Sequence, residues 1–167
     1  MTDQQSSTTH TGRVAVVTGA STGIGEATAR ELRRSGWTVY AVARRAERLE
    51  ALARETGAIP APCDITSDAE VDALRDQVLE EQGRVDALLN ISGGARGTDR
   101  VAEASTEDWE WMYQVNVLGT MRLTRAFLPA LRANGEGTVL NLTSLAAHRA
   151  YEGGGGYNAA KYAERAM

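Results

Sequence analysis

The stretch RVAVVTGASTGIGEATARELRRSG, residues 13–36, decides the fold. Its first seven residues form a short apolar run that is rich in β-branched side chains and ends in glycine, a pattern that predicts a buried parallel strand. Residues 24–35 place Ile24, Ala27 and Leu32 near one helical face, with charges opposite, and Gly36 stops the pattern. A strand, a glycine-rich turn and a helix therefore follow one another at the start of the chain.

The same alternation continues along the chain. Further strands are predicted at 37–43, 59–62, 85–92 and 137–144. Further helices are predicted at 45–56, after the capping box formed by Ser67 and Glu70, across 106–133 with a break near Pro129, and from Tyr157 onward. Five mostly apolar strands that alternate with helices predict an α/β fold with a doubly wound parallel sheet. Ligands of such sheets bind beyond the carboxyl ends of the strands, so the residues after each strand are the candidates for chemistry.

Composition excludes several classes of function. The net charge of −4 and the pI near 5.3 give no uniform basic surface, so nucleic acid is not an expected partner. Cys63 is the only cysteine, so we expect neither a disulfide nor a metal site, and a cytoplasmic location is expected. No stretch approaches the roughly 18 apolar residues of a membrane span. Residues 1–12 are predicted to be a disordered leader, followed by one domain at 13–167.

The loop TGASTGIG, residues 18–25, follows the first predicted strand. Gly19, Gly23 and Gly25 allow a tight turn in which backbone N–H groups and a helix N-terminus approach a pyrophosphate. Two alternatives are a turn that only links strand to helix, and the G-x-S-x-G nucleophile elbow of a hydrolase, with Ser21 as nucleophile and His148 as base. The order of elements counts against the hydrolase, because too little chain precedes this strand to supply an oxyanion loop.

The segment after the second predicted strand bears on the choice of cofactor. Folds that bind NAD place an acidic residue about 20 positions beyond the glycine loop, where it holds the ribose 2′-OH. This chain has Arg44 and Arg45 there, two guanidiniums that could grip a 2′-phosphate, although an arginine pair can also simply open a helix in solvent. The missing acid favours NADP(H) over NAD(H). Asp64 is placed either to accept a hydrogen bond from an adenine amino group or to cap the next helix.

Tyr157 and Lys161, the only lysine of the chain, stand four residues apart on the last predicted helix. This spacing puts the two side chains on one helical face, with Cβ atoms about 5–6 Å apart. A free phenol loses its proton near about pH 10, so it needs neighbouring positive charge to exchange protons near neutrality. An ordinary surface pair is the alternative, but the single lysine at this position favours a functional pair. Four glycines at 153–156 precede the tyrosine and add an ordering cost.

Two further polar residues are candidates for the same site. Ser144 ends the last predicted strand, where its hydroxyl can polarise a substrate carbonyl or only serve the turn. Asn116 lies within a predicted helix, where asparagine is a poor helix former. A role in a local hydrogen-bond network, a kink or simple exposure would explain it.

Four segments in this order resemble the short-chain dehydrogenase/reductase family, classical type. TGASTGIG resembles its TGxxxGIG cofactor loop, LLNISGG (88–94) its LxNNAG segment, VNVLG (115–119) its asparagine motif and YNAAK (157–161) its YxxxK pair. The resemblance runs from residue 13 to residue 167 and implies a Rossmann-type fold. Ile91 and Ser92 depart from the family pattern, whereas Asn90 matches it.

The resemblance implies a catalytic set of Asn116, Ser144, Tyr157 and Lys161. In the family the tyrosine exchanges a proton with the substrate oxygen, the serine orients the carbonyl, the lysine binds the nicotinamide ribose and favours the ionised tyrosine, and the asparagine holds a water. Arg44 is similar to the basic residue that follows the second strand in members of the family that bind NADP(H), so the resemblance again implies NADP(H). The predicted cofactor-binding residues are Gly19, Ser21, Thr22, Gly23, Ile24, Gly25, Arg44, Arg45, Asp64, Ile65, Asn90, Tyr157 and Lys161.

Family members continue for roughly another third of the chain, with two more strands, a substrate lid and a helix used in dimers. The resemblance therefore implies a C-terminally truncated sheet of about five strands here, and a homo-oligomer for a full-length form rather than for this length. Two functions are open as hypotheses. The first is an NADP(H)-dependent oxidoreductase that acts on a small carbonyl compound or secondary alcohol. The second is a binding-only dinucleotide module without a substrate pocket or turnover.

Overall fold

The computed structural model describes residues 12–167, so the predicted leader at 1–12 lies outside the described residues except for Gly12. The elements in chain order are β1 (Val14–Thr18), α1 (Gly23–Arg34), β2 (Thr38–Ala43), α2 (Ala46–Thr56), β3 (Ile59–Pro62), α3 (Asp68–Gln82), β4 (Ala87–Asn90), α4 (Thr106–Tyr113), a π-helical turn (Gln114–Leu118), α5 (Gly119–Ala133), β5 (Thr138–Asn141), a 3₁₀ turn (Leu145–Ala147) and α6 (Gly155–Arg165). The strands and helices predicted from the sequence are present, with ends that differ by up to three residues.

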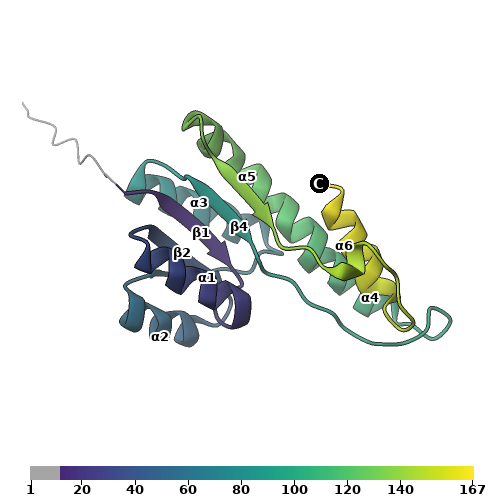
Figure 1. Ribbon diagram of the computed structural model, residues 1–167. Coiled ribbons are helices and arrows are strands. Elements are labelled where there is room, and N and C mark those ends of the chain that lie inside the picture. Colours follow the sequence, from purple (N-terminus) through teal and green to yellow (C-terminus); the bar gives the residue numbers. More distant parts are fainter. Residues whose placement is uncertain (1–11) are drawn as a thin grey trace, which may run out of the picture.

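The five strands form one parallel sheet in the order β3-β2-β1-β4-β5. The chain reverses its direction of travel across the sheet between β1 and β4, and all strands end at the same edge (Figure 1). The prediction of an α/β fold with a doubly wound parallel sheet is thereby confirmed. The reversal creates a crevice beyond the carboxyl ends of β1 and β4, where ligands of such sheets bind.

Side chains that alternate along the strands build a separate core on each face of the sheet. Val14 and Val16 face a cluster completed by α3 and α5, whereas Ala15 and Val17 face a cluster completed by α1 and α2. Every residue of β1 is buried. A strand buried on both faces must be apolar throughout, which explains the run that opens the domain.

The helical region at 106–133 differs from the prediction of a break near Pro129. The irregularity lies earlier, at the π-helical turn Gln114–Leu118 that contains Asn116, and α5 runs through Pro129 to Ala133. Pro129 is exposed, so the carbonyl that loses its helical partner can bind water. The residues on either side, Phe127 and Leu131, are buried against the sheet and hold the helix together.

The glycine run lets α6 pack closely on α4. The helix begins at Gly155, two residues before the predicted start. A Cβ on Gly156 would lie 3.0 Å from Cδ1 of Trp109 and would also meet Met112, both on α4. Tyr157, Trp109 and Met112 belong to a third hydrophobic cluster, which joins these two helices at the end of the molecule (Figure 1). Within residues 12–167 no helix is both long enough and apolar enough to cross a membrane.

We predict that Gly25→Ala lowers the free energy of unfolding by about 1–3 kcal/mol, because overpacking outweighs the higher helix propensity of alanine. A Cβ at position 25 would meet the Gly19 carbonyl and would lie 2.8 Å from the Thr18 carbonyl oxygen, and neither backbone group can move away freely. Urea denaturation measures the effect. Gly12→Ala is the control, since its Cβ would meet nothing closer than 3.9 Å. Equal stabilities of the two variants would contradict the close approach of α1 to the first loop.

Candidate active site

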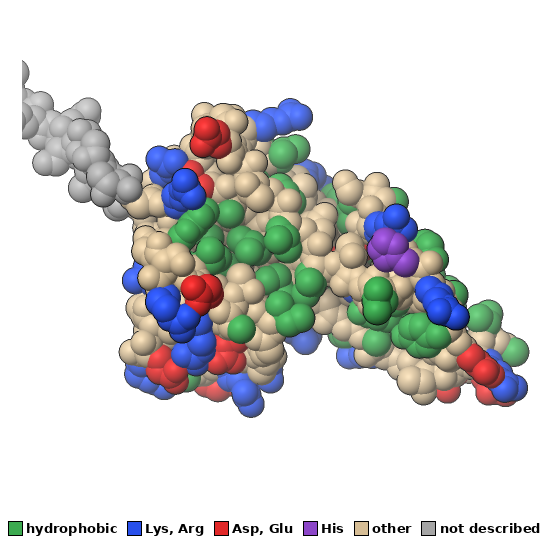
Figure 2. Space-filling model, viewed as in Figure 1, with side chains coloured by type: hydrophobic (Ala, Val, Ile, Leu, Met, Phe, Trp, Pro, Cys, Tyr) green, Lys and Arg blue, Asp and Glu red, His purple; other side chains and the backbone are tan. Residues whose placement is uncertain are grey.

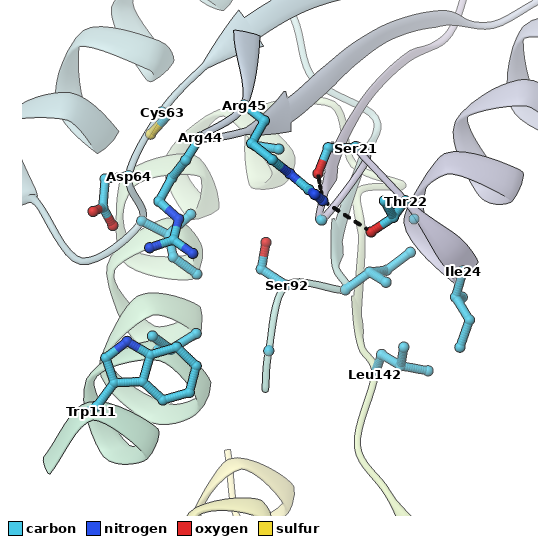
Figure 3. Close-up of a pocket in the computed structure, with 17 residues that line it drawn as sticks. Ser21, Thr22, Ile24, Arg44, Arg45, Cys63, Asp64, Ser92, Trp111 and Leu142 are labelled. Carbon is cyan, nitrogen blue, oxygen red and sulfur yellow. Dashed lines mark hydrogen bonds between the residues drawn. The ribbon is translucent and has the colours of Figure 1, made fainter. Parts of the chain in front are cut away.

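A cavity of about 600 Å³ lies beyond the carboxyl ends of β1 to β4 (Figure 3). Its walls come from the loops that follow these four strands, from the start of α1, from Leu142 after β5, and from α4 and the π-helical turn. The residues that line it are Gly19, Ser21, Thr22, Ile24, Gly25, Ala43, Arg44, Arg45, Cys63, Asp64, Ile65, Ile91, Ser92, Gly93, Trp111, Val115 and Leu142. The place is the one that the sheet topology specifies for a ligand.

The glycine loop and the segment after β4 are locked together by Thr18. The Thr18 side chain is fully buried, and its hydroxyl accepts hydrogen bonds from the N–H groups of Ile91 and Ser92, each at 2.9 Å. Gly19 follows with φ +68°, and a Cβ there would lie 3.1 Å from the Ser92 nitrogen. The loop therefore requires glycine both for its backbone conformation and for its contact with the neighbouring segment.

The guanidinium groups of Arg44 and Arg45 reach the cavity from the end of β2. Nη2 of Arg45 donates to the hydroxyl oxygens of Ser21, at 2.8 Å, and Thr22, at 3.3 Å (Figure 3). Arg44 extends into the part of the cavity beside Asp64, on the same side as Trp111 (Figure 3). Both arginines are exposed, and Arg45 is the N-cap residue of α2, as the alternative of a solvated pair that opens a helix expects. The contacts of Arg45 with Ser21 and Thr22 are the observation that favours a role at the cavity.

Asp64 places an ionised carboxylate on the cavity wall. Burial alone would raise its pKa, but hydrogen bonds from the N–H and hydroxyl of Thr66, with the charges of Arg44 and Arg122, hold the pKa below its ordinary value. The predicted helix cap is supplied instead by Ser67, whose Oγ accepts from the N–H of Glu70 at 3.3 Å. Asp64 is therefore available as a hydrogen-bond acceptor at this wall.

Asn116 joins the π-helical turn to the segment after β4. Its amide is fully buried, donates to the carbonyls of Gly94 and Met112, both at 2.8 Å, and accepts from the Gly94 N–H at 3.1 Å. A Cβ on Gly93 would lie 2.6 Å from Oδ1 of Asn116 and 3.3 Å from Nζ of Lys161. Of the possibilities raised by the sequence, the structure places Asn116 in a hydrogen-bond network rather than on an exposed surface.

Tyr157 and Lys161 lie on the same face of α6. Nζ of Lys161 lies 5.9 Å from the centre of the Tyr157 ring and donates to the Leu142 carbonyl, just after β5, at 3.0 Å. The lysine side chain is buried, and its ammonium also pairs with Glu164 at 2.6 Å. Because Leu142 and Gly93 line the main cavity, the ammonium lies directly behind the wall of that cavity.

Ser144 and Tyr157 line a second hollow of about 300 Å³. The other residues around it are Leu145, Ala146, Arg149, Ala150 and Tyr151. Oγ of Ser144 accepts from the Ala146 N–H at 3.1 Å, so the serine both begins the 3₁₀ turn and borders this hollow. Ser144 and Tyr157 thus border one hollow between the end of β5 and the start of α6, and Lys161, which does not line this hollow, lies one helical turn beyond the tyrosine.

Some predicted cofactor-binding residues lie away from the main cavity. Gly23 shapes the turn through its φ of +59°, and Tyr157 and Lys161 lie beyond the cavity wall. The Asn90 side chain points into the sheet, where its amide donates to Oδ1 of Asn141 at 2.9 Å and to Thr124 at 3.3 Å. The remaining members of the predicted set line the cavity, namely Gly19, Ser21, Thr22, Ile24, Gly25, Arg44, Arg45, Asp64 and Ile65.

The structure does not assemble the hydrolase alternative. Oγ of Ser21 accepts from Arg45, and no hydrogen bond joins it to His148, the only histidine within residues 12–167. His148 is exposed at the end of the 3₁₀ turn (Figure 2). In the same part of the chain, no group of three or more histidine, cysteine or acidic residues could hold a metal ion.

Sequence reasoning missed several residues of the cavity wall. Trp111 faces the cavity from α4 (Figure 3). The Arg96 guanidinium lies 4.1 Å from the centre of the Trp111 ring. No pattern in the sequence distinguishes this tryptophan from Trp109, which packs against the same hydrophobic cluster but does not line the cavity. Cys63, Val115 and Leu142 were also not predicted. The positions of Cys63 after β3 and Leu142 after β5 follow the rule that ligands bind at strand ends, whereas Val115 lies in the π-helical turn.

Comparison with known proteins decides the family. The family model for the short chain dehydrogenases matches residues 13–167. The chain belongs to this family. It is 53% identical to an uncharacterised oxidoreductase of Mycobacterium tuberculosis, over 93% of this chain and 60% of that protein. It is 36% identical to the NADP-dependent 3-hydroxy acid dehydrogenase of Salmonella typhimurium, over 89% of this chain and 60% of that protein.

A solved short-chain dehydrogenase structure has the same fold. A metagenomic short-chain oxidoreductase in complex with NADP matches with a TM-score of 0.88 and 34% identity, over 92% of this chain and 72% of that one. The chain spans about three fifths of the length of the two curated short-chain dehydrogenase relatives described above.

We predict that Thr18→Val weakens binding of a nicotinamide dinucleotide by about tenfold and lowers the free energy of unfolding by about 1–3 kcal/mol. Valine keeps the shape of threonine but leaves the buried N–H groups of Ile91 and Ser92 without an acceptor. Fluorescence titration with NADPH and urea denaturation measure the two effects. Thr18→Ser, which retains the hydroxyl, is the matched control. Equal binding by the valine and serine variants would contradict a role of the hydroxyl in shaping the cavity.

Proposed function

We propose that the chain carries the catalytic site of an NADP(H)-dependent oxidoreductase, which transfers a hydride between nicotinamide and a carbonyl compound or secondary alcohol. The observation that carries this proposal is the position of Tyr157 and Lys161 on one face of α6. Ser144 borders the same hollow as the tyrosine, and the cavity with the glycine loop lies next to the lysine. Oxidoreductases and dehydrogenases among the relatives support it.

The main cavity fits a dinucleotide. Gly19 and Gly25 keep the first loop free of side chains that would fill it, and the N-terminus of α1 at Gly23 opens from this loop. A helix N-terminus with free N–H groups favours a pyrophosphate. Asp64 could accept from an adenine amino group at the opposite wall. NADP(H), when bound, supplies or accepts the hydride.

Arg44 and Arg45 support a preference for NADP(H) over NAD(H). They stand where an NAD-binding fold has an acidic residue, and Arg45 already holds the hydroxyls of Ser21 and Thr22 beside the glycine loop. Guanidinium and hydroxyl donors together suit a 2′-phosphate. The NADP complex of a similar structure and the NADP-dependent relative agree with this assignment.

The chemical roles follow from the side chains themselves. Tyr157 would donate a proton to the developing alkoxide, or remove one from an alcohol, and Ser144 would hold the substrate oxygen. The Lys161 ammonium would favour the ionised phenol and offer an N–H to a ribose hydroxyl. Asn116 would act by fixing the segment 93–94, since its amide protons are both used by backbone carbonyls.

The test is NADPH oxidation, measured with a panel of ketones and aldehydes beside a cofactor-binding titration. We expect turnover, and we expect Tyr157→Phe to lower kcat by about 10²–10⁴-fold while NADPH binding is retained. Tyr162→Phe, on the exposed side of the same helix, is the control. Binding without turnover by the unaltered protein would favour the binding-only module instead. Full activity of the Tyr157→Phe variant would overturn the catalytic assignment.

We predict that Arg45→Gln weakens NADPH binding by about tenfold or more and leaves NADH binding nearly unchanged. Loss of one charge-assisted contact to a phosphate has a cost of this size. Arg48→Gln, one helical turn further along α2, is the control because it removes an exposed arginine that does not line the cavity. Equal losses for NADPH and NADH in the Arg45 variant would contradict recognition of the 2′-phosphate.

A carboxylate on the substrate would suit the second hollow. Arg149 borders it beside Tyr157, and among the described residues no acidic side chain forms an ion pair with this arginine. The relative named for 3-hydroxy acids supports the same class of substrate. A 3-oxo acid compared with its methyl ester is therefore the most informative pair in the panel, and no preference for the acid would reject this substrate class.

We further propose that residues 13–167 act as one domain and that the protein is cytoplasmic. The single continuous sheet and the lone, buried Cys63 support these two assignments. A homo-oligomer is proposed for a longer form that carries the rest of the family fold. Sedimentation of both lengths tests the last assignment.

A further inference from the structure

Glu164 is a buried acidic residue that the proposed mechanism does not use. It lies on α6, three residues after Lys161, and only 1% of it is exposed. An ionised carboxylate out of contact with water is strongly unfavourable unless it is paired and hydrogen-bonded. The position of this side chain therefore has to be explained by its partners.

The partners of Glu164 belong to the proposed catalytic machinery. Oε2 accepts from Nζ of Lys161 at 2.6 Å, and Oε1 lies 3.4 Å from the hydroxyl of Thr120. That hydroxyl in turn lies 3.0 Å from the backbone carbonyl of Asn116. No other charged side chain of the described residues is within hydrogen-bond distance of the carboxylate. Glu164 thus links α6 to α5 and to the π-helical turn.

The Lys161 ammonium uses two of its hydrogen-bond donors within the fold. Of its three N–H groups, one bonds to the Leu142 carbonyl and one to Glu164, which leaves one for a ligand. These two bonds fix the direction of the third. A carboxylate in contact with the ammonium also offsets part of the positive charge that reaches the phenol, whose ring centre is 5.9 Å from Nζ.

We propose that Glu164 is a positioning residue for Lys161, which holds the ammonium against the end of β5 and moderates the charge that it presents to Tyr157. The proposal rests on the function assigned to Tyr157 above, but the ion pair can be tested without turnover. A hydrophobic residue would fill the same space without the cost of burying a charge. The acid is therefore explained by its effect on the lysine.

Stability should depend on pH through this residue. Burial raises the pKa of Glu164, against the lowering effects of Lys161 and Thr120. The unfolded chain then loses this proton at a lower pH than the folded one, so the contribution of Glu164 to the free energy of unfolding falls as pH rises above about 4.5. Glu164→Gln has no such proton. We expect the stability of the variant, relative to the unaltered protein, to increase from pH 4 to pH 7.

The direct test is a tyrosinate absorbance titration, in which the signal of the matching Tyr157→Phe protein is subtracted to isolate Tyr157. We expect Glu164→Gln to move the titration midpoint of Tyr157 to lower pH by about one unit, because removal of a negative charge favours the phenolate. Glu164→Asp, which restores the charge, should return the midpoint toward its original value. Glu80→Gln removes an exposed carboxylate on α3 and is the control.

The outcomes separate the two proposals. A shifted midpoint in Glu164→Gln only, with turnover of the unaltered protein, supports both. A shifted midpoint without any turnover supports the ion pair and rejects the oxidoreductase. Turnover with an unchanged midpoint, or equal shifts in Glu164→Gln and Glu80→Gln, overturns the role of Glu164.

Discussion

The interaction on which the site depends is the set of contacts made by the Lys161 ammonium. A buried positive charge persists only where the fold supplies acceptors for it, and here they come from two elements, the Leu142 carbonyl after β5 and the Glu164 carboxylate on α6. These contacts bring α6 against the open end of the sheet. They also hold Lys161 directly behind the wall of the main cavity, while Tyr157, on the same helical face, borders the second hollow.

The order of the strands determines which loops lie beside the Lys161 ammonium. Because β1 and β4 are neighbours, the loops after them share one crevice, and Thr18 fastens the second loop to the first through a single buried hydroxyl. Asn116 then holds Gly94 through two hydrogen bonds, and Gly93 lies between the Asn116 amide and the Lys161 ammonium. A ligand bound on the glycine loop and a proton exchanged at Tyr157 would therefore share one rigid frame.

Much of this arrangement follows from local sequence. The apolar runs and the glycines after β1 predict both the sheet and the loop, because a buried strand and a tight turn each allow few residue types. The contacts of Asn90 could not be predicted from local sequence, since only the pairing of β4 with β5 brings its side chain to Asn141. Glu164 and Trp111 were missed because the sequence around them does not indicate which face of α6 or of α4 packs against the rest of the protein. The break predicted near Pro129 was wrong, because Pro129 is exposed and the buried residues Phe127 and Leu131 hold the helix against the sheet.

The most direct measurement is transfer of deuterium from NADPH labelled at C4 to the carbonyl carbon of a ketone, followed by mass spectrometry in a single turnover. We expect the label on the product carbon with the unaltered protein, and we expect its loss with Lys161→Met under conditions where NADPH remains bound. Transfer at an undiminished rate by the methionine variant would contradict the proposed role of the ammonium. Absence of label from the product of the unaltered protein would contradict the proposed reaction.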